Sequence, residues 1–124
     1  MSNLIWVALG GALGAVGRYL VGKFFATDAV MGFPFATLIV NIVGCFALAF
    51  LYAHLLTATG QQQQHWLFLG VGLIGAFTTF STFSLEFVLL AQQGEFIKAA
   101  SYASLSFIGC LLATVSGLWL KANI

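Results

Sequence analysis

The sequence has 124 residues, of which 61% are hydrophobic and only 6% carry a formal charge. A soluble domain has roughly 25% charged residues, so this chain cannot cover a water-facing surface. Its net charge of +1 provides no clustered basic face for nucleic acid. Its two cysteines are too few for a disulfide-rich scaffold. The composition therefore predicts a small integral membrane protein.

Four apolar stretches are long enough to cross a bilayer, which takes about 20 mostly apolar residues per helix. We expect these spans at about residues 4–26, 33–57, 66–91 and 97–120. The polar residues collect in short connectors, so residues 1–124 are predicted to form a single four-helix transmembrane domain. The strands of a membrane barrel would be roughly 10 residues long and would alternate apolar and polar side chains. These stretches do neither, and an all-α membrane protein is predicted.

The four spans place both termini on the same side of the membrane. Lys121 is then the basic residue of that side, whereas Lys23 and Lys98 lie on the other, joined by Arg18 if it reaches the interface. Basic residues orient a membrane protein through their excess on the cytoplasmic side, and this excess is small. Two readings remain: a single orientation set by that excess, or insertion both ways and pairing with an inverted copy.

Small residues form two ridges of the kind that lets helices approach closely in lipid. Gly10 and Gly14 have GxxxG spacing in the first span. Gly109, Ala113 and Gly117 recur at every fourth position in the last span. We interpret both ridges as packing surfaces. Because four short helices are too few to enclose a polar path, we also expect an oligomer.

Polar side chains inside the spans are the candidates for function, because they are costly in lipid. Arg18 either extends to the interface or lends positive potential to an aqueous vestibule. Asn41 either bonds a neighbouring helix or offers uncharged N–H donors to an anion. Glu86 would be protonated or paired if buried, which leaves proton coupling open.

The fourth span carries a stripe of small polar side chains. Its members recur at every fourth position and share one helix face: Tyr102, Ser106, Cys110 and Thr114. Hydroxyls at this spacing either bond the carbonyls of their own helix or line a narrow polar track. The pattern alone leaves both readings open.

The third span contains the most unusual stretch, GAFTTFSTFS at residues 75–84. Glycine and β-branched threonine lower helix propensity, so we expect a break in this helix. A break frees backbone carbonyls, which suit a hard cation such as Na⁺. Phe80 and Phe83 share a face, where their electropositive ring edges can meet an anion. The alternative for the two rings is ordinary packing within the bundle.

The sequence shows no nucleophile–base pairing, phosphate loop or redox motif, so we do not expect an enzyme. Cys45 and Cys110 lie within spans without a metal-ligand spacing, and His54 and His65 lie near the ends of spans. Structural or interfacial roles are expected for all four.

Three motifs resemble the Fluc (CrcB) fluoride channels. They are Gly10-Gly11-x-x-Gly14-Ala15-x-x-Arg18-Tyr19, Asn41-x-x-Gly44, and Gly75-x-x-Thr78-Thr79-Phe80-Ser81-Thr82-Phe83. The resemblance covers nearly the whole chain in length, span count and motif order, and the TTFSTFS string is its most specific part.

The resemblance implies a multi-pass protein of the bacterial inner membrane. It implies an antiparallel, dual-topology homodimer in the lipid bilayer, with two pores that passively export fluoride ion and relieve its toxicity. One structural Na⁺ that is not transported would lie at the dimer interface, held by the backbone carbonyls of Gly75 and Thr78.

The resemblance also implies roles for side chains. Phe80 and Phe83 would line each pore, Asn41 would contact fluoride, and Arg18 would belong to the vestibule. The polar track would comprise Ser81, Thr82, Glu86, Tyr102, Ser106 and Thr114.

Two rival functions can be compared with this reading. A small multidrug transporter would need a glutamate in the first span, whereas Glu86 lies in the third. A structural subunit of a larger complex would need the packing ridges but not the combination of asparagine, hydroxyls and paired phenylalanines. Neutral donors bind an anion weakly enough to let it leave, which conduction requires. The sequence therefore favours the channel.

Overall fold

The computed structural model describes residues 2–25, 32–55 and 62–124. In this part, helix α1 spans Ser2–Phe25, α2 spans Phe35–Leu55 and α6 spans Phe96–Ala122. The third membrane segment consists of α3 (Gln62–His65), η2 (Trp66–Ile74), α4 (Gly75–Phe77) and α5 (Phe80–Gln92). The expected ends of the first two spans, at residues 26 and 57, lie outside the described residues.

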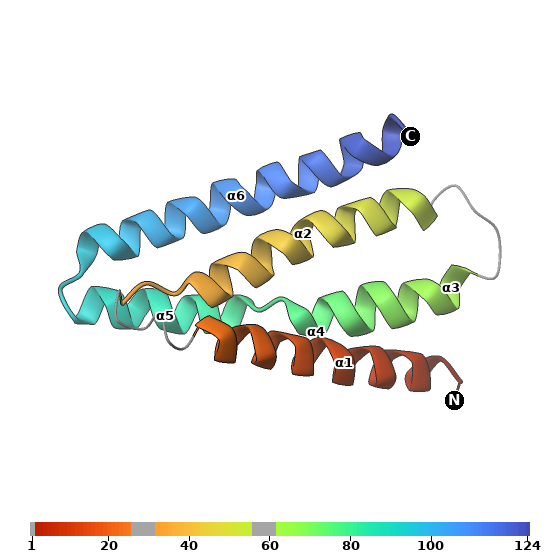
Figure 1. Ribbon diagram of the computed structural model, residues 1–124, viewed down its shortest axis with the longest axis horizontal. Helices are drawn as coiled ribbons and strands as arrows, with labels where there is room; N and C mark the ends of the chain where they lie inside the picture. The colour runs from red at the N-terminus through yellow and green to blue at the C-terminus, as the bar shows by residue number, and fades with distance from the viewer. Residues whose placement is uncertain (1, 26–31, 56–61) are drawn as a thin grey trace.

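Four helical segments of the described chain are long and apolar enough to cross a membrane. They are Asn3–Phe25, Phe35–Leu55, Gln62–Gln92 and Phe96–Ala122. Figure 1 shows that α1 and the α3–α5 segment run in one direction while α2 and α6 run in the other. Both ends of the chain therefore lie at the same end of the bundle (Figure 1). The predicted all-α architecture with four membrane-spanning helices is confirmed.

The glycine ridge of α1 packs against η2 and α4. A Cβ added at Gly10 would collide with the carbonyl oxygen of Phe68, and one at Gly14 with that of Leu73. Backbone against backbone is the closest approach that two helices can make, and it excludes any side chain at these positions. The packing role predicted for the GxxxG pair is confirmed.

The small-residue ridge of α6 packs against α2. A Cβ at Gly117 would lie 2.5 Å from the backbone oxygen of Phe46, and one at Gly109 would lie 2.9 Å from the Cδ1 atom of Ile42. The two helices run in the same direction side by side (Figure 1). The packing role predicted for this ridge is confirmed. The close approach also holds the polar stripe of α6 against α2.

The third membrane segment is broken at two residues. Thr78 (φ −81°, ψ 159°) and Thr79 (φ −156°, ψ 119°) are extended and separate α4 from α5. The Thr79 Oγ1 atom then accepts the backbone N–H of Thr82 at 3.2 Å, which caps the new helix. The break predicted from the glycine, threonine and serine content is confirmed, and it falls in the middle of that stretch.

The winding before the break is wider than that of an α-helix. Residues Trp66–Ile74 form a π-helix, and the Gly75 N–H reaches back to the carbonyl of Gly70. Such winding is rare in proteins, and where it occurs it often lies at a functional site. No pattern in the sequence indicates this wider winding.

Few side chains of the described chain are buried by the chain itself. One cluster combines Leu38, Leu90, Ala99 and the fully buried Tyr102, with Phe83 packed against it. Large apolar residues are exposed along the outer faces of α1 and α6. In a bilayer these faces meet lipid or another membrane helix, so the thin core lies where α2, α5 and α6 meet.

Candidate functional site

Two polar stripes face each other between α2 and α6. On α2 the stripe consists of Thr37, Asn41 and Cys45, and on α6 it consists of Tyr102, Ser106 and Cys110. Each residue follows the previous one by four positions, so each stripe lies along one helix face. Because the helices run in the same direction (Figure 1), the stripes meet at three successive levels.

At the first level, both stripes bind the carboxyl group of Glu86 from α5. The Thr37 hydroxyl donates to Glu86 Oε1 at 2.9 Å, and the Tyr102 hydroxyl donates to Oε2 at 2.7 Å. Within the described part of the chain, no lysine or arginine forms an ion pair with Glu86. Neutral hydroxyls from two helices therefore hold this carboxyl group in place.

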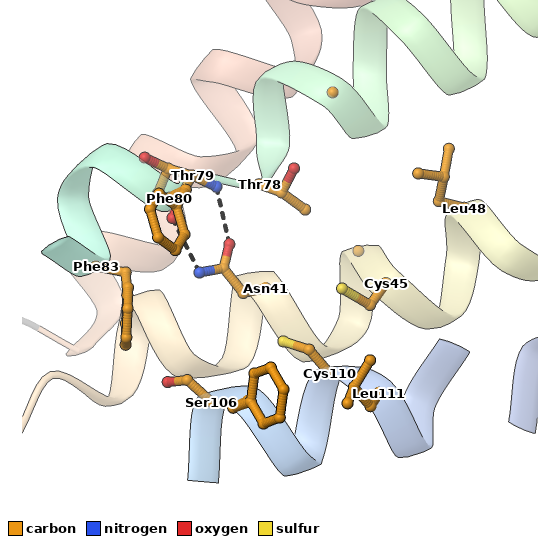
Figure 2. Close-up of a pocket in the computed structure, with 13 residues that line it drawn as sticks. Asn41, Cys45, Leu48, Thr78, Thr79, Phe80, Phe83, Ser106, Cys110 and Leu111 are labelled. Atoms are coloured by element: carbon orange, nitrogen blue, oxygen red, sulfur yellow. Dashed lines mark hydrogen bonds between the residues drawn. The ribbon is translucent and has the colours of Figure 1, made fainter. Parts of the chain in front are cut away.

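At the second level, Asn41 bonds the backbone of the break. Its Nδ2 donates to the Thr79 carbonyl at 3.0 Å, and its Oδ1 accepts the Thr79 N–H at 2.8 Å (Figure 2). The interhelical role, one of the two alternatives for this residue, is thus present. An amide nitrogen has two hydrogens, so one Nδ2–H donor is left over from this pairing.

An open cavity of about 470 Å³ lies beside this pair of hydrogen bonds. It is formed by α2, the break, the start of α5 and α6 (Figure 2). The described residues that line it are Asn41, Gly44, Cys45, Leu48, Gly75, Thr78, Thr79, Phe80, Phe83, Ser106, Phe107, Cys110 and Leu111. None of these side chains carries a formal charge.

Ser106 is the lining residue with the clearest unmet bonding capacity. Its side chain is buried, with 7% of the residue exposed, and its Oγ has no hydrogen-bond partner among the described residues. A buried polar atom without a partner is costly, so the Ser106 hydroxyl is available to bond a group that enters the cavity. The cavity thus combines a free hydroxyl with the remaining N–H of Asn41.

The two candidate pore rings differ in their surroundings. Phe80 is 78% exposed, although its centroid lies 5.5 Å from that of Phe83. Phe83 also lies 5.1 Å from the Tyr102 ring and packs against the core cluster. Packing within the chain therefore accounts for the position of Phe83 but not for that of Phe80.

The break changes the bonding of two backbone carbonyls. In a continuous α-helix the Gly75 carbonyl would accept the Thr79 N–H, which here bonds Asn41. The Thr78 carbonyl would accept the Thr82 N–H, which here bonds the Thr79 hydroxyl. Both carbonyls thus lose their regular helical donor, and both residues line the cavity. Among the described residues, no cluster of three His, Cys, Asp or Glu side chains offers a metal site.

Other predicted site residues lie away from the cavity lining. Ser81 and Thr82 cluster with the Thr79 hydroxyl at 3.2 and 3.0 Å, at the start of α5. Thr114 bonds the Cys110 carbonyl of its own helix at 2.9 Å, the back-bonding alternative for the stripe. Arg18 lies on α1, and its Nε is buried without a partner in the described structure.

Two polar residues of this site were missed at the sequence level. Thr37 holds Glu86, and the side chain of Thr79 caps α5. The spacing of Thr37, Asn41 and Cys45 by four residues is the signal that would have identified the α2 stripe. No local signal indicates that Thr79 bonds Asn41, because 38 positions separate them.

Comparison with known proteins gives a consistent set of relatives. The model of the family described as "CrcB-like protein, Camphor Resistance (CrcB)" matches residues 5–118. The chain is 46% identical to the "Fluoride-specific ion channel FluC" of Idiomarina loihiensis, over 99% of this chain and 98% of the relative. It is also 46% identical to the protein of the same name from Shewanella loihica, over 94% of each chain. The "Fluoride-specific ion channel FluC 1" of Halalkalibacterium halodurans is 46% identical over 94% of this chain and 95% of the relative.

Proposed function

The chain belongs to the CrcB-like protein family, and from this premise we propose that it is a fluoride-selective ion channel. It lets fluoride leave the cytoplasm passively across the bacterial inner membrane, which relieves fluoride toxicity. The relatives named as fluoride-specific ion channels match it over nearly its full length. The chain is a multi-pass membrane protein and not an enzyme.

The observation that carries this proposal is the uncharged cavity between α2, α5 and α6. A small, strongly hydrated anion enters a protein only if donors replace its water. The Ser106 hydroxyl and the second N–H of Asn41 can serve as such donors, because both residues line the cavity. Because neither is charged, they hold the anion without trapping it, as a lysine or arginine would.

The aromatic rings complete the path on the side of α5. Ring edges are electropositive, so Phe80 and Phe83 can meet an anion edge-on. The large exposure of Phe80 supports this role, since packing within the chain buries little of its ring. We assign Glu86, Tyr102, Ser81, Thr82 and Thr114 to the polar track that leads onward, and Arg18 to the vestibule.

The functional unit is an antiparallel homodimer with two pores. Lys23 lies in the last turn of α1 and Lys98 near the start of α6, whereas Lys121 lies in the last turn of α6. This bias is too small to impose one orientation. Insertion in both orientations supplies the inverted copy. That copy would cover the exposed Phe80 and close the cavity, which is open in the single chain.

The freed carbonyls suit a structural Na⁺ at the dimer interface. Na⁺ is a hard cation that prefers oxygen ligands, and Gly75 and Thr78 each have a carbonyl without its helical donor. One chain offers two such oxygens, and an inverted copy doubles them. Bound there, the cation would neutralise carbonyl dipoles and fix the two breaks against each other.

Efflux from liposomes tests the function directly. Purified protein is reconstituted into vesicles loaded with potassium fluoride or potassium chloride, and valinomycin is added to carry the counter-ion. A fluoride electrode should record rapid release, while chloride-loaded vesicles retain their anion. Equal release of both anions, or release of neither, would contradict the proposal.

Topology is tested separately with added charge. Lysines appended after residue 124 should force one orientation, and lysines added near Gly94 should force the other. Each variant alone should lose efflux, and coexpression of both should restore it. Full efflux from either variant alone would contradict the antiparallel dimer.

A further inference from the structure

The third level of the two polar stripes joins the two cysteines of the chain. Cys45 lies one turn beyond Asn41 on α2, and Cys110 lies one turn beyond Ser106 on α6. Both cysteines are free and partly exposed, and their side chains come from the two helices that enclose one side of the cavity. Both line the cavity, where Figure 2 shows them on the facing sides of the two helices.

Two adjacent thiols on different helices have a chemistry that neither has alone. A structural zinc site takes four ligands, and no cluster of three suitable side chains exists among the described residues. Soft centres, by contrast, select thiolate ligands. Divalent mercury and the arsenic of a trivalent organoarsenical are satisfied by two sulfurs. The ligand class is therefore a thiophilic metal or metalloid that needs two sulfur donors.

We propose that Cys45 and Cys110 form a dithiol site for such thiophilic ligands, and that its occupation blocks the fluoride path. The blocking part of the proposal rests on the proposed function; the binding part does not. Four residues of helix rise about 6 Å, so a bound group lies within one turn of Asn41 and Ser106. The cavity of about 470 Å³ is within the range of small-molecule sites, about 300–1,000 Å³.

The reaction with an arsenical oxide needs no oxidant or reductant. Phenylarsine oxide carries arsenic in the trivalent state, and the arsenic stays trivalent. Two As–S bonds form with the thiols while the arsenic–oxygen bond breaks, and the oxygen leaves as water with the two thiol protons. The product is a ring that includes both sulfurs, which makes it stable against excess monothiol and reversible by a competing dithiol.

Intact-mass measurement of the reconstituted protein tests the binding. With phenylarsine oxide, each chain should gain one phenylarsenic group with loss of one water, and should keep it in excess 2-mercaptoethanol. 2,3-Dimercaptopropanol should remove it. Cys45→Ala and Cys110→Ala, checked for intact folding by gel filtration, should each lose the monothiol-resistant adduct.

Three mass results would overturn the dithiol site. The first is an unmodified wild-type chain, and the second is an equally resistant adduct on either single variant. The third is an arsenic bridge between two chains in place of one within a chain.

Efflux measured on the same vesicles tests the block. Wild-type fluoride release should fall to the leak of protein-free vesicles and recover with the dithiol. In each alanine variant, the ratio of release with and without the arsenical should stay near one. An adduct that leaves efflux unchanged would overturn the block but not the site. A wild-type protein that never releases fluoride would refute the proposed function, while the mass result still decides the site.

Discussion

Gly44 of α2 provides the sharpest test of how the broken helix is held. A Cβ at this position would fall on the Cγ2 methyl of Thr78. Its next neighbours, Thr78 Cβ at 3.6 Å and Phe77 Cδ1 at 3.7 Å, are at ordinary contact distance. A single methyl group is therefore the obstacle to a larger residue at Gly44.

The size of the effect follows from this geometry. Forcing an extra methyl into a packed contact costs about 1–3 kcal/mol, which we expect for Gly44→Ala. Thr78→Ser removes the opposing methyl, at about 0.8 kcal/mol, and keeps the hydroxyl that bonds the Ile74 carbonyl at 3.1 Å. The double variant should therefore be more stable than Gly44→Ala alone, with a coupling energy of about 1–3 kcal/mol in favour of the pair.

Four proteins are compared: the wild type, Gly44→Ala, Thr78→Ser and the double variant. Their unfolding is measured in mixed detergent micelles, and their fluoride efflux is measured as a second readout. Gly44→Ala should lower the unfolding midpoint and slow efflux, and Thr78→Ser added to it should recover part of both losses. Changes that add within about 0.5 kcal/mol would show that the two residues do not touch, and would refute this placement of the break against α2.

Three further predictions concern packing and the pore. Gly117→Ala, whose methyl would meet backbone, should destabilise by about 1–3 kcal/mol in detergent unfolding, and Gly109→Ala, whose methyl would meet a flexible side-chain end, by less; equal costs would contradict the structure. Phe80→Ile should slow fluoride efflux without changing the unfolding midpoint, whereas Phe83→Ile should slow efflux and lower the midpoint. Unchanged efflux in the two variants would show that the rings serve only packing. Tyr102→Phe removes the 2.7 Å bond to the carboxyl group of α5 and should cost about 1–3 kcal/mol, a loss that an unshifted midpoint would disprove.

The sequence predicts those parts of the fold that depend on local composition. Length and apolar content determine the four membrane helices, and the glycine, threonine and serine residues of 75–84 determine where the third one breaks. The glycine ridges can also be recognised from the local sequence, because a helix face without side chains is a surface on which another helix can pack closely. These features need no knowledge of the partner helix.

The remaining features depend on which segments meet across the fold. The pairing of Asn41 with the backbone of Thr79 requires the break and α2 to lie side by side, which no local pattern encodes. Thr114 shares its spacing with Ser106, yet it bonds its own helix while the Ser106 hydroxyl has no partner in the described structure. The π-helix of η2 consists of apolar residues and glycine, as much of the other membrane helices does, so its sequence does not distinguish its wider winding from that of an α-helix.

A passive fluoride path built from neutral donors has a reversal potential that depends on fluoride alone, which can be measured. Protein in a planar bilayer is placed between unequal fluoride concentrations, first at equal pH and then with a pH gradient. We expect a current whose reversal potential follows the fluoride gradient alone and is unchanged when chloride is added to one side. A reversal potential that shifts with the pH gradient would show proton coupling and contradict the channel.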